Sequence, residues 1–278
     1  MKRIVSLLLL FSIAASGWWF DKIHPEYRTL VVDFLSPDNF HTLEIKYTAE
    51  QIMDTHTFAL LKSDEHKYLD SEIKYYPYLL MEVKYAQDKL HTNKGVILWD
   101  MIDGEMVVNE QNWEKTSGFG DCIKAKVQKS EFKILNLLAQ RGGTMDREHL
   151  SRHLLVENEI LDSWIESCRK KKLVVQSGND YRLHMNSPKM YVTPETTLDD
   201  KLVTKTFHKG GRLSRRFSQN EIKGIAQSAF GADFVINKST KVYLPVCAIT
   251  VENPDGSLHT SYWNTLNGKE LSFYTLFE

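Results

Sequence analysis

The 278-residue chain has few cysteines and almost no excess of charge of either sign. Its three cysteines, Cys122, Cys168 and Cys247, lie far apart in apolar stretches, where a buried thiol behaves as a small hydrophobic group. An odd and scattered set argues against a disulfide framework and leaves room for a single bridge. The formal net charge of −1 gives no overall attraction to nucleic acid or to an acidic membrane surface.

Several motifs of catalysis and cofactor binding are absent as well. The chain has no Cys-x-x-Cys pair, no glycine-rich phosphate loop and no nucleophile elbow. His149 and His153 have the i, i+4 spacing of a zinc pair, but Leu150 stands where a zincin has glutamate, and no third ligand is near in the sequence. We therefore predict no enzyme activity, no cofactor and no metal site. A third hypothesis, beside a binding protein and a DNA-binding regulator, is an enzyme whose site is assembled from residues distant in the sequence.

The N-terminus has the layout of a secretory signal. Lys2 and Arg3 precede an apolar run from Ile4 to Ala14, and small residues follow. We predict that residues 1–17 are a signal peptide or, if uncleaved, a short membrane anchor. This places the protein in the periplasm or cell envelope. The alternative is a buried N-terminal strand in a cytoplasmic protein.

The middle of the chain, residues 130–185, predicts three helices followed by a two-stranded hairpin. Ser130 can cap the first helix, which a Gly-Gly pair ends, and Thr144 or Asp146 can cap the second. The third helix carries an apolar stripe that can bury against the other two. The stripe comprises Ile160, Leu161, Trp164, Ile165 and Cys168. This order of elements resembles a winged helix-turn-helix domain.

In the DNA-binding members of that family, the outer face of the third helix meets phosphates and base edges. Here the same face is rich in carboxylates, which repel phosphates. Its residues are Glu157, Asn158, Glu159, Asp162, Ser163 and Glu166. We predict that this face binds another protein, and nucleic acid is the lesser candidate.

Basic residues form a second candidate surface, for an anionic partner. One group follows the third helix, where basic residues also suit a solvated helix end, and the other lies in a later loop. The residues are Arg169, Lys170, Lys171, Lys172, Lys209, Arg212, Arg215 and Arg216. If they bind DNA, the protein is a cytoplasmic winged-helix regulator of transcription.

Two stretches on either side of the central one match each other. Residues 99–104 read Trp-Asp-Met-Ile-Asp-Gly and residues 263–268 read Trp-Asn-Thr-Leu-Asn-Gly, and Pro77 and Pro245 precede them at corresponding places. A capping box opens a helix before each meander. We therefore predict two copies of one unit, in which a helix covers one face of a small antiparallel sheet.

The repeat also bears on a group of carboxylates in the first copy that could suggest paired acids or a metal site. In the second copy their counterparts are neutral or basic. Asp100 corresponds to Asn264, Asp103 to Asn267 and Glu105 to Lys269. Asp and Asn share the ability to form turns, so we assign these positions a structural role.

The succession of helix, strand, hairpin, strand and Asn-Gly turn is similar to that of PepSY-like domains of exported and envelope proteins. Residues Tyr243 to Leu271 carry the resemblance best. It implies a regulatory, inhibitory or scaffolding role outside the cytoplasm.

The predicted fold class is α+β, with two similar helix-plus-antiparallel-sheet units and a winged-helix domain between them. In chain order we expect a signal peptide or anchor, a first α+β unit, the winged-helix domain, a connector with a basic loop, and a second α+β unit. Their bounds are residues 1–17, 18–125, 130–185, 186–217 and 218–278.

Overall fold

The structure is a computed structural model, and five stretches of the chain are described: residues 39–86, 91–185, 188–198, 201–206 and 211–271. The expected signal segment and Lys209 lie outside them. Helices and strands both contribute to the fold, which confirms the predicted α+β class. None of the described helices has the length and apolar character needed to span a bilayer.

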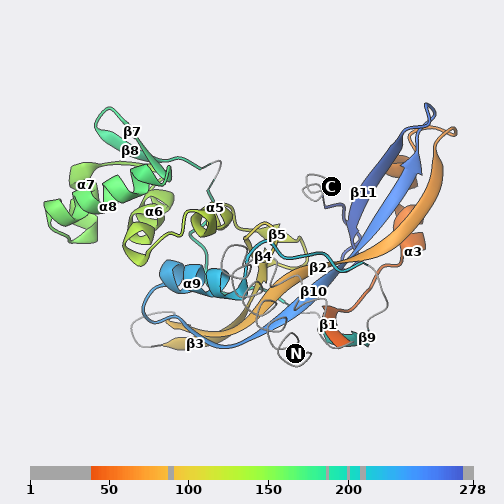
Figure 1. Ribbon diagram of the computed structural model, residues 1–278, viewed down its shortest axis with the longest axis horizontal. Helices are drawn as coiled ribbons and strands as arrows, with labels where there is room; N and C mark the ends of the chain where they lie inside the picture. The colour runs from red at the N-terminus through yellow and green to blue at the C-terminus, as the bar shows by residue number, and fades with distance from the viewer. Residues whose placement is uncertain (1–38, 87–90, 186–187, 199–200, 207–210, 272–278) are drawn as a thin grey trace, which may run out of the picture. The chain divides into compact units, whose positions relative to one another are not determined.

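A mixed sheet of eight strands carries most of the described β structure (Figure 1). At its centre two long strands, β2 (Lys67–Ala86) and β10 (Val235–Glu252), pair antiparallel. Strand β3 (Thr92–Asp100) pairs with β2, and β11 (Leu258–Asn264) pairs with β10. The outer strands are β4 (Met106–Asn109) and β5 (Glu114–Lys115) beyond β3, and β1 (Asn39–Leu43) and β9 (Leu202–Thr206) beyond β10.

The long strands pair about a local twofold axis that relates the two copies of the repeat. Tyr75 pairs with Pro245, and Pro77 pairs with Tyr243. Each proline therefore faces the tyrosine that lies two residues before the other proline. The first half of each strand pairs with the second half of the other, so that the two copies share one sheet.

The turns that follow β3 and β11 are built alike. Trp99 and Trp263 each lie one residue before the end of their strand. Gly104 and Gly268 have φ angles of 83° and 68°, the left-handed conformation that an Asx-Gly turn requires. In each turn the first Asx side chain accepts the N–H two residues further on, at 2.7 Å in the first copy and 2.9 Å in the second.

Each helix covers strands of the other copy. Helices α3 (Ala49–Thr55) and α4 (Thr57–Leu60) belong to the first copy, and α9 (Gln219–Phe230) belongs to the second. The first pair shares a buried cluster with second-copy residues Cys247, Ile249, Val251 and Trp263. In the same way, α9 shares a buried cluster with first-copy residues Leu79, Met81, Val83 and Trp99.

Backbone hydrogen bonds just before α3 and α9 also join the two copies. The N–H groups of Lys46 and Tyr47 donate to Thr265 O, at 3.0 and 2.9 Å. In the other copy the N–H groups of residues 216 and 217 donate to Met101 O, both at 2.9 Å. The two copies are therefore interleaved. Residues 18–125 and 218–278, predicted as separate units, share one sheet and two buried clusters.

Pro77 lies in a central strand, although prolines in sheets are usually confined to edge strands and bulges. Tyr75 N–H donates to Gly211 O, and Met101 N–H donates to Pro77 O. Both bonds are on the same side of β2, because alternate residues of a strand direct their polar groups to the same side. On this side of β2, Tyr75 bonds to the connector and Pro77 bonds to the turn after β3, so Pro77 lies at the boundary between two neighbouring segments. Its missing N–H therefore interrupts no ladder.

The segment 119–185 forms helices and a small second sheet. The helices are α5 (Phe119–Lys124), α6 (Lys129–Gln140), α7 (Arg147–Leu154) and α8 (Asn158–Lys170). The antiparallel sheet has the order β6 (Thr144–Asp146), β8 (Asp180–Leu183), β7 (Val174–Ser177). The predicted three helices and hairpin are present, and β6 is an additional strand.

Of the helix caps predicted in this segment, Asp146 forms and Ser130 does not. Asp146 caps α7 by accepting the N–H of His149 at 2.9 Å. Ser130 does not cap α6, because that helix begins at Lys129, and the Glu131 carboxylate accepts the N–H of Gln128 at 2.6 Å. The capping acid is thus one turn inside the helix, as in the reciprocal half of a capping box.

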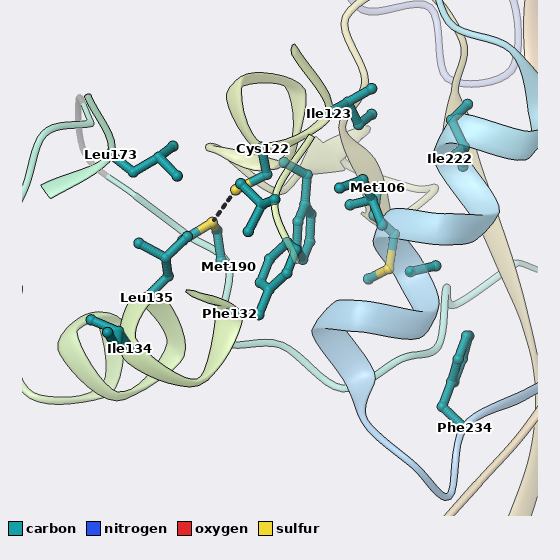
Figure 2. Close-up of a cluster of buried hydrophobic side chains, with 14 of the residues drawn as sticks. Met106, Cys122, Ile123, Phe132, Ile134, Leu135, Leu173, Met190, Ile222 and Phe234 are labelled. Atoms are coloured by element: carbon teal, nitrogen blue, oxygen red, sulfur yellow. Dashed lines mark hydrogen bonds between the residues drawn. The ribbon is translucent and has the colours of Figure 1, made fainter. Parts of the chain in front are cut away.

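One buried cluster joins these helices to the sheet (Figure 2). Cys122 of α5 lies with its Sγ 3.8 Å from Met190 Sδ, beside Phe132 of α6. All three cysteines are buried and free, so the single bridge that the sequence left open is not formed. Burial raises the pKa of the Cys168 thiol to about 12 and that of Cys247 to about 11.

Part of the connector, residues 186–217, is built into the sheet instead of lying on its surface. Thr196 is buried, and its N–H donates to Val96 O at 2.7 Å. Its hydroxyl accepts the N–H of Leu98 at 2.9 Å and donates to Val107 O at 2.5 Å. This segment fills the place where β3 and β4 separate.

Candidate functional site

The outer face of α8 is exposed and carries the residues predicted to bind a partner. Leu161, Ile165 and Cys168 are buried on the opposite face, and this burial fixes the rotation of the helix. All six predicted contact residues are exposed: Glu157, Asn158, Glu159, Asp162, Ser163 and Glu166. The structure therefore brings them together on one face.

Two apolar side chains accompany this acidic face. Leu155, at the left-handed C-cap of α7, is 89% exposed, and Ile160, in the first turn of α8, is 44% exposed. We expected Ile160 in the buried stripe, which was wrong, because Leu161 and Ile165 fill the contact with the neighbouring helices. We call Leu155, Ile160 and the six polar residues the α8 surface.

Part of the acidic charge is already matched by basic neighbours. Asp162 accepts two hydrogen bonds from the Arg147 guanidinium, both 2.7 Å long, and these lower the pKa of that carboxyl. Glu166 lies 3.2 Å from Arg169 and 3.9 Å from Lys170. The C-terminal half of the surface is thus nearly neutral.

Among the described residues, the unpaired negative charge of this surface therefore lies at the start of α8. Within the described part of the chain, no basic side chain pairs with Glu157 or Glu159. Both carboxylates also lie at the helix N-terminus, where the helix dipole favours negative charge. A partner would meet two unmatched carboxylates beside exposed Leu155 and Ile160.

The predicted basic patch is divided among structural contacts. Lys171 points inward: its Nζ lies 2.6 Å from a Glu131 carboxylate oxygen and 3.0 Å from Lys126 O. Ser167 also donates to Glu131, at 2.6 Å, and these hydrogen bonds hold the pKa of Glu131 below its usual value although burial acts the other way. Lys171 thus fastens the end of α8 to the start of α6.

The backbone of the connector docks on the first copy at two of its arginines. Arg212 forms a parallel bridge with Tyr75 of β2, and Arg216 N–H donates to the first-copy turn. Arg215 Nε is buried and finds no hydrogen-bond partner in the described residues. Binding of an anionic partner by the two basic groups stays a prediction. Arg169, Lys170 and Lys172 are exposed at the end of α8.

The carboxylates of the first turn make structural contacts, in line with our assignment. Buried Asp100 and half-buried Asp103 share the Lys115 ammonium, at 2.5 and 2.8 Å. Burial, followed by the charge of Asp100, raises the pKa of Asp103 to about 6. Glu105 accepts the N–H groups at the start of α5, those of Gly118, Phe119 and Gly120.

Asp103→Asn should stabilise the protein at neutral pH. The folded pKa of Asp103 lies above its ordinary value of 3.8, so its contribution to stability is full below that pH and is lost as the pH rises through about 6. Asn267 fills the equivalent place in the second copy, which shows that asparagine can form the turn. We expect a gain of about 1–2 kcal/mol in unfolding free energy at pH 7 and little change at pH 4, measured by urea titration.

The control for this variant is Asn267→Asp, which adds a carboxylate to the second turn, where no ammonium corresponds to that of Lys115 among the described residues. Because Asn267 is half-buried, we expect only a small loss at pH 7. A loss of stability at pH 7 in Asp103→Asn would show that the ion pair with Lys115 outweighs the burial of charge.

A polar groove at the ends of β2 and β3 was not foreseen. Tyr85 donates its hydroxyl to Glu195 at 2.5 Å, and burial raises the pKa of Tyr85. Glu195 lines two open hollows of about 540 and 800 Å³. The two residues are 110 positions apart in unlike segments, so no local pattern could have paired them.

No three His, Cys, Asp or Glu side chains of the described residues gather as metal ligands would. His149 Nδ1 lies 2.6 Å from an Asp146 carboxylate oxygen, and His153 Nδ1 lies 2.8 Å from His149 O. These contacts serve the helix and its cap.

The chain was compared with protein-family models, with curated proteins and with solved structures. None of the three comparisons finds a match. The function must therefore be inferred from the chain's own residues, and the α8 surface offers the clearest chemistry.

Proposed function

We propose that this protein is a non-enzymatic binding or assembly module of the bacterial cell envelope or exported space, and that it contacts a partner protein through the α8 surface. The observation that carries the proposal is the combination of unmatched Glu157 and Glu159 with exposed Leu155 and Ile160. Apolar residues ringed by charge are the usual composition of a transient protein interface. The partner's surface is expected to be basic.

The electrostatics of α8 also disfavour a reader of DNA. Recognition helices contact bases with residues near their N-terminus, and there α8 has Glu157 and Glu159. These carboxylates would face phosphates and the acceptor atoms of bases. The fixed ion pair of Lys171 with Glu131 removes one of the basic residues that could compensate.

The location outside the cytoplasm is proposed on the sequence of residues 1–17 and on the PepSY-like pattern of Tyr243 to Leu271. Cell fractionation with N-terminal sequencing tests it directly. A cleaved N-terminus in an envelope fraction would support export. An intact Met1 on cytoplasmic protein would contradict it.

Reversing charge at the start of α8 should weaken the partner contact without disturbing the fold. A photo-crosslinking residue at Ile160 would trap the partner in the native host. We expect Glu157→Lys with Glu159→Lys to reduce the cross-linked product about tenfold or more, because a basic partner would then be repelled. Exposed surface changes cost under about 0.5 kcal/mol, so the melting curve should stay unchanged.

The matched control is Asp64→Lys with Glu65→Lys, which makes the same change of charge at two exposed residues of a distant loop. It should leave the cross-link intact. Equal loss in both double variants, or an unaltered cross-link in the α8 variant, would contradict the proposal.

A cytoplasmic DNA-binding regulator is the second candidate, favoured by the exposed Arg169, Lys170 and Lys172 at the end of α8. It predicts binding to duplex DNA at physiological salt that weakens as salt rises, and that weakens further when Lys170 and Lys172 become alanine. The proposed protein contact predicts no such binding.

A further inference from the structure

Leu155 combines two features that are unfavourable for the folded chain by itself. Its backbone is left-handed, with a φ of 52° and a ψ of 46°, at the end of α7. Glycine or asparagine usually occupies such a position, because the Cβ of other residues is crowded there. The Leu155 side chain is also 89% exposed, so its own packing does not offset this cost.

Other residues with a positive φ show how the cost is usually met. After α6 the left-handed residue is Gly142, with a φ of 80°. Trp113 has a φ of 52°, and its side chain is buried. Lys126 and Lys172 are exposed and charged, so water solvates their side chains. Among the described residues, Leu155 is the one apolar residue that joins a positive φ to an exposed side chain.

The turn between α7 and α8 holds this side chain in a fixed position. Leu155 N–H donates to Ser151 O at 3.0 Å, and the Ser151 hydroxyl donates to Val156 O at 3.2 Å. Leu154 and Val156 pack against the buried cluster that joins the helices to the sheet. The residues on both sides of Leu155 thus face inward while its own side chain lies in solvent. A contact residue that is fixed before binding loses little conformational freedom on association.

The charges next to Leu155 indicate the kind of surface that would cover it. Glu157 and Glu159 follow it within four residues and are exposed, and neither has a basic partner in the described part of the chain. Carboxylates of this kind are complemented by lysine or arginine across an interface. An exposed leucine is complemented by an apolar pocket, because burial removes its surface from water.

We propose that Leu155 is the anchor of the α8 surface and inserts into an apolar pocket of the partner protein, and that basic side chains at the rim of this pocket meet Glu157 and Glu159. The inference rests on the proposed function and adds to it the residue that contributes most to the affinity. Backbone strain persists at sites where function requires it. Leu155 is such a site, since its side chain stabilises the complex and its backbone destabilises the free protein.

Leu155→Gly should therefore have opposite effects on the fold and on the complex. The melting temperature of the free protein should rise by about 2–4 °C, because glycine tolerates the positive φ. The dissociation constant should rise about 10-fold to 100-fold, because burial of the leucine side chain is lost. Leu155→Met keeps an apolar side chain of similar volume, so its dissociation constant should rise less than about threefold.

The probe is the protein that a photo-crosslinking residue at Ile160 traps in the native host, identified by mass spectrometry, purified and titrated into the full-length variants by calorimetry. The control is Lys126→Gly, which replaces an exposed residue with a φ of 49° outside the α8 surface. It should raise the melting temperature as Leu155→Gly does and leave the dissociation constant unchanged. The loss in Leu155→Gly should also be the same at low and high salt, since an apolar contact is not screened.

The double charge reversal at Glu157 and Glu159 separates failure of this inference from failure of the proposed function. Weakened binding in that variant together with unchanged binding in Leu155→Gly would overturn the anchor and leave the proposed function standing. Unchanged binding in both, or no trapped protein, would overturn both. A lower melting temperature in Leu155→Gly would show that Leu155 already stabilises the fold, and it would also overturn the inference.

Discussion

Residues 211–271, expressed alone, are expected to be unfolded as a monomer, although they contain a complete helix, hairpin and turn. The helix α9 buries Ile222, Ile225 and Ala226 in a cluster that holds Leu79 and Trp99 of the other copy. Each large apolar side chain left exposed costs about 1.5–3 kcal/mol, and a domain has only about 5–15 kcal/mol in total. Loss of β2 also removes the partner of β10 along nearly its whole length.

Circular dichroism and amide dispersion in NMR spectra would measure this. Addition of a separate chain of residues 39–210 should restore the dispersion, because it supplies the strands that α9 covers. A cooperative melt of the monomeric fragment would contradict the interleaved packing. A fragment that folds only as a concentration-dependent dimer would agree with it, since a second copy could then provide the missing strands.

Gly104→Ala should destabilise the protein far more than Gly268→Ala, although the two glycines occupy equivalent turns. A Cβ at residue 104 would lie 2.8 Å from Gly120 Cα and 2.8 Å from the Phe217 ring. At residue 268 the nearest atom would be in the Tyr47 ring, at 3.4 Å. Both variants bear the cost of a positive φ, about 1–2 kcal/mol, and Gly104→Ala adds overpacking of about 1–3 kcal/mol.

Urea titration of the full-length variants would give the two losses. Gly268→Ala serves as the control, because it isolates the cost of backbone conformation. The clash at Gly104 cannot relax easily, since Gly120 is itself held against Asp103 O, 2.2 Å from where its own Cβ would lie. Equal losses in the two variants would show that packing around the first turn is looser than these distances imply.

Local features of the sequence predicted the structure well, because their hydrogen bonds join residues close in the chain. The capping boxes of Thr48 and Ser218 formed as expected. So did the left-handed turns at Gly104 and Gly268. These interactions depend on a few neighbouring residues and little on the surrounding fold.

The sequence did not predict which strands and helices pack against one another. A stripe of apolar residues shows which face of α9 is buried, and it does not show whether the covered sheet belongs to the same copy or the other. The same limit applies to the candidate site. Its acidic face was predicted from α8 alone, whereas the pairing of Asp162 with Arg147 and of Lys171 with Glu131 depends on how α8 packs on α7 and α6.

The interleaving of the two copies has a consequence for how such a chain can change by descent. Deleting either copy would remove the helix that covers the strands of the other copy. Loss of a single copy would therefore expose apolar residues of the copy that remains. A pair of identical single-copy chains, related by a true twofold axis, could make the same contacts across β2 and β10. Fusion of two such chains would preserve the contacts between β2 and β10, and each copy could then acquire substitutions of its own, such as Asp100 in one turn and Asn264 in the other.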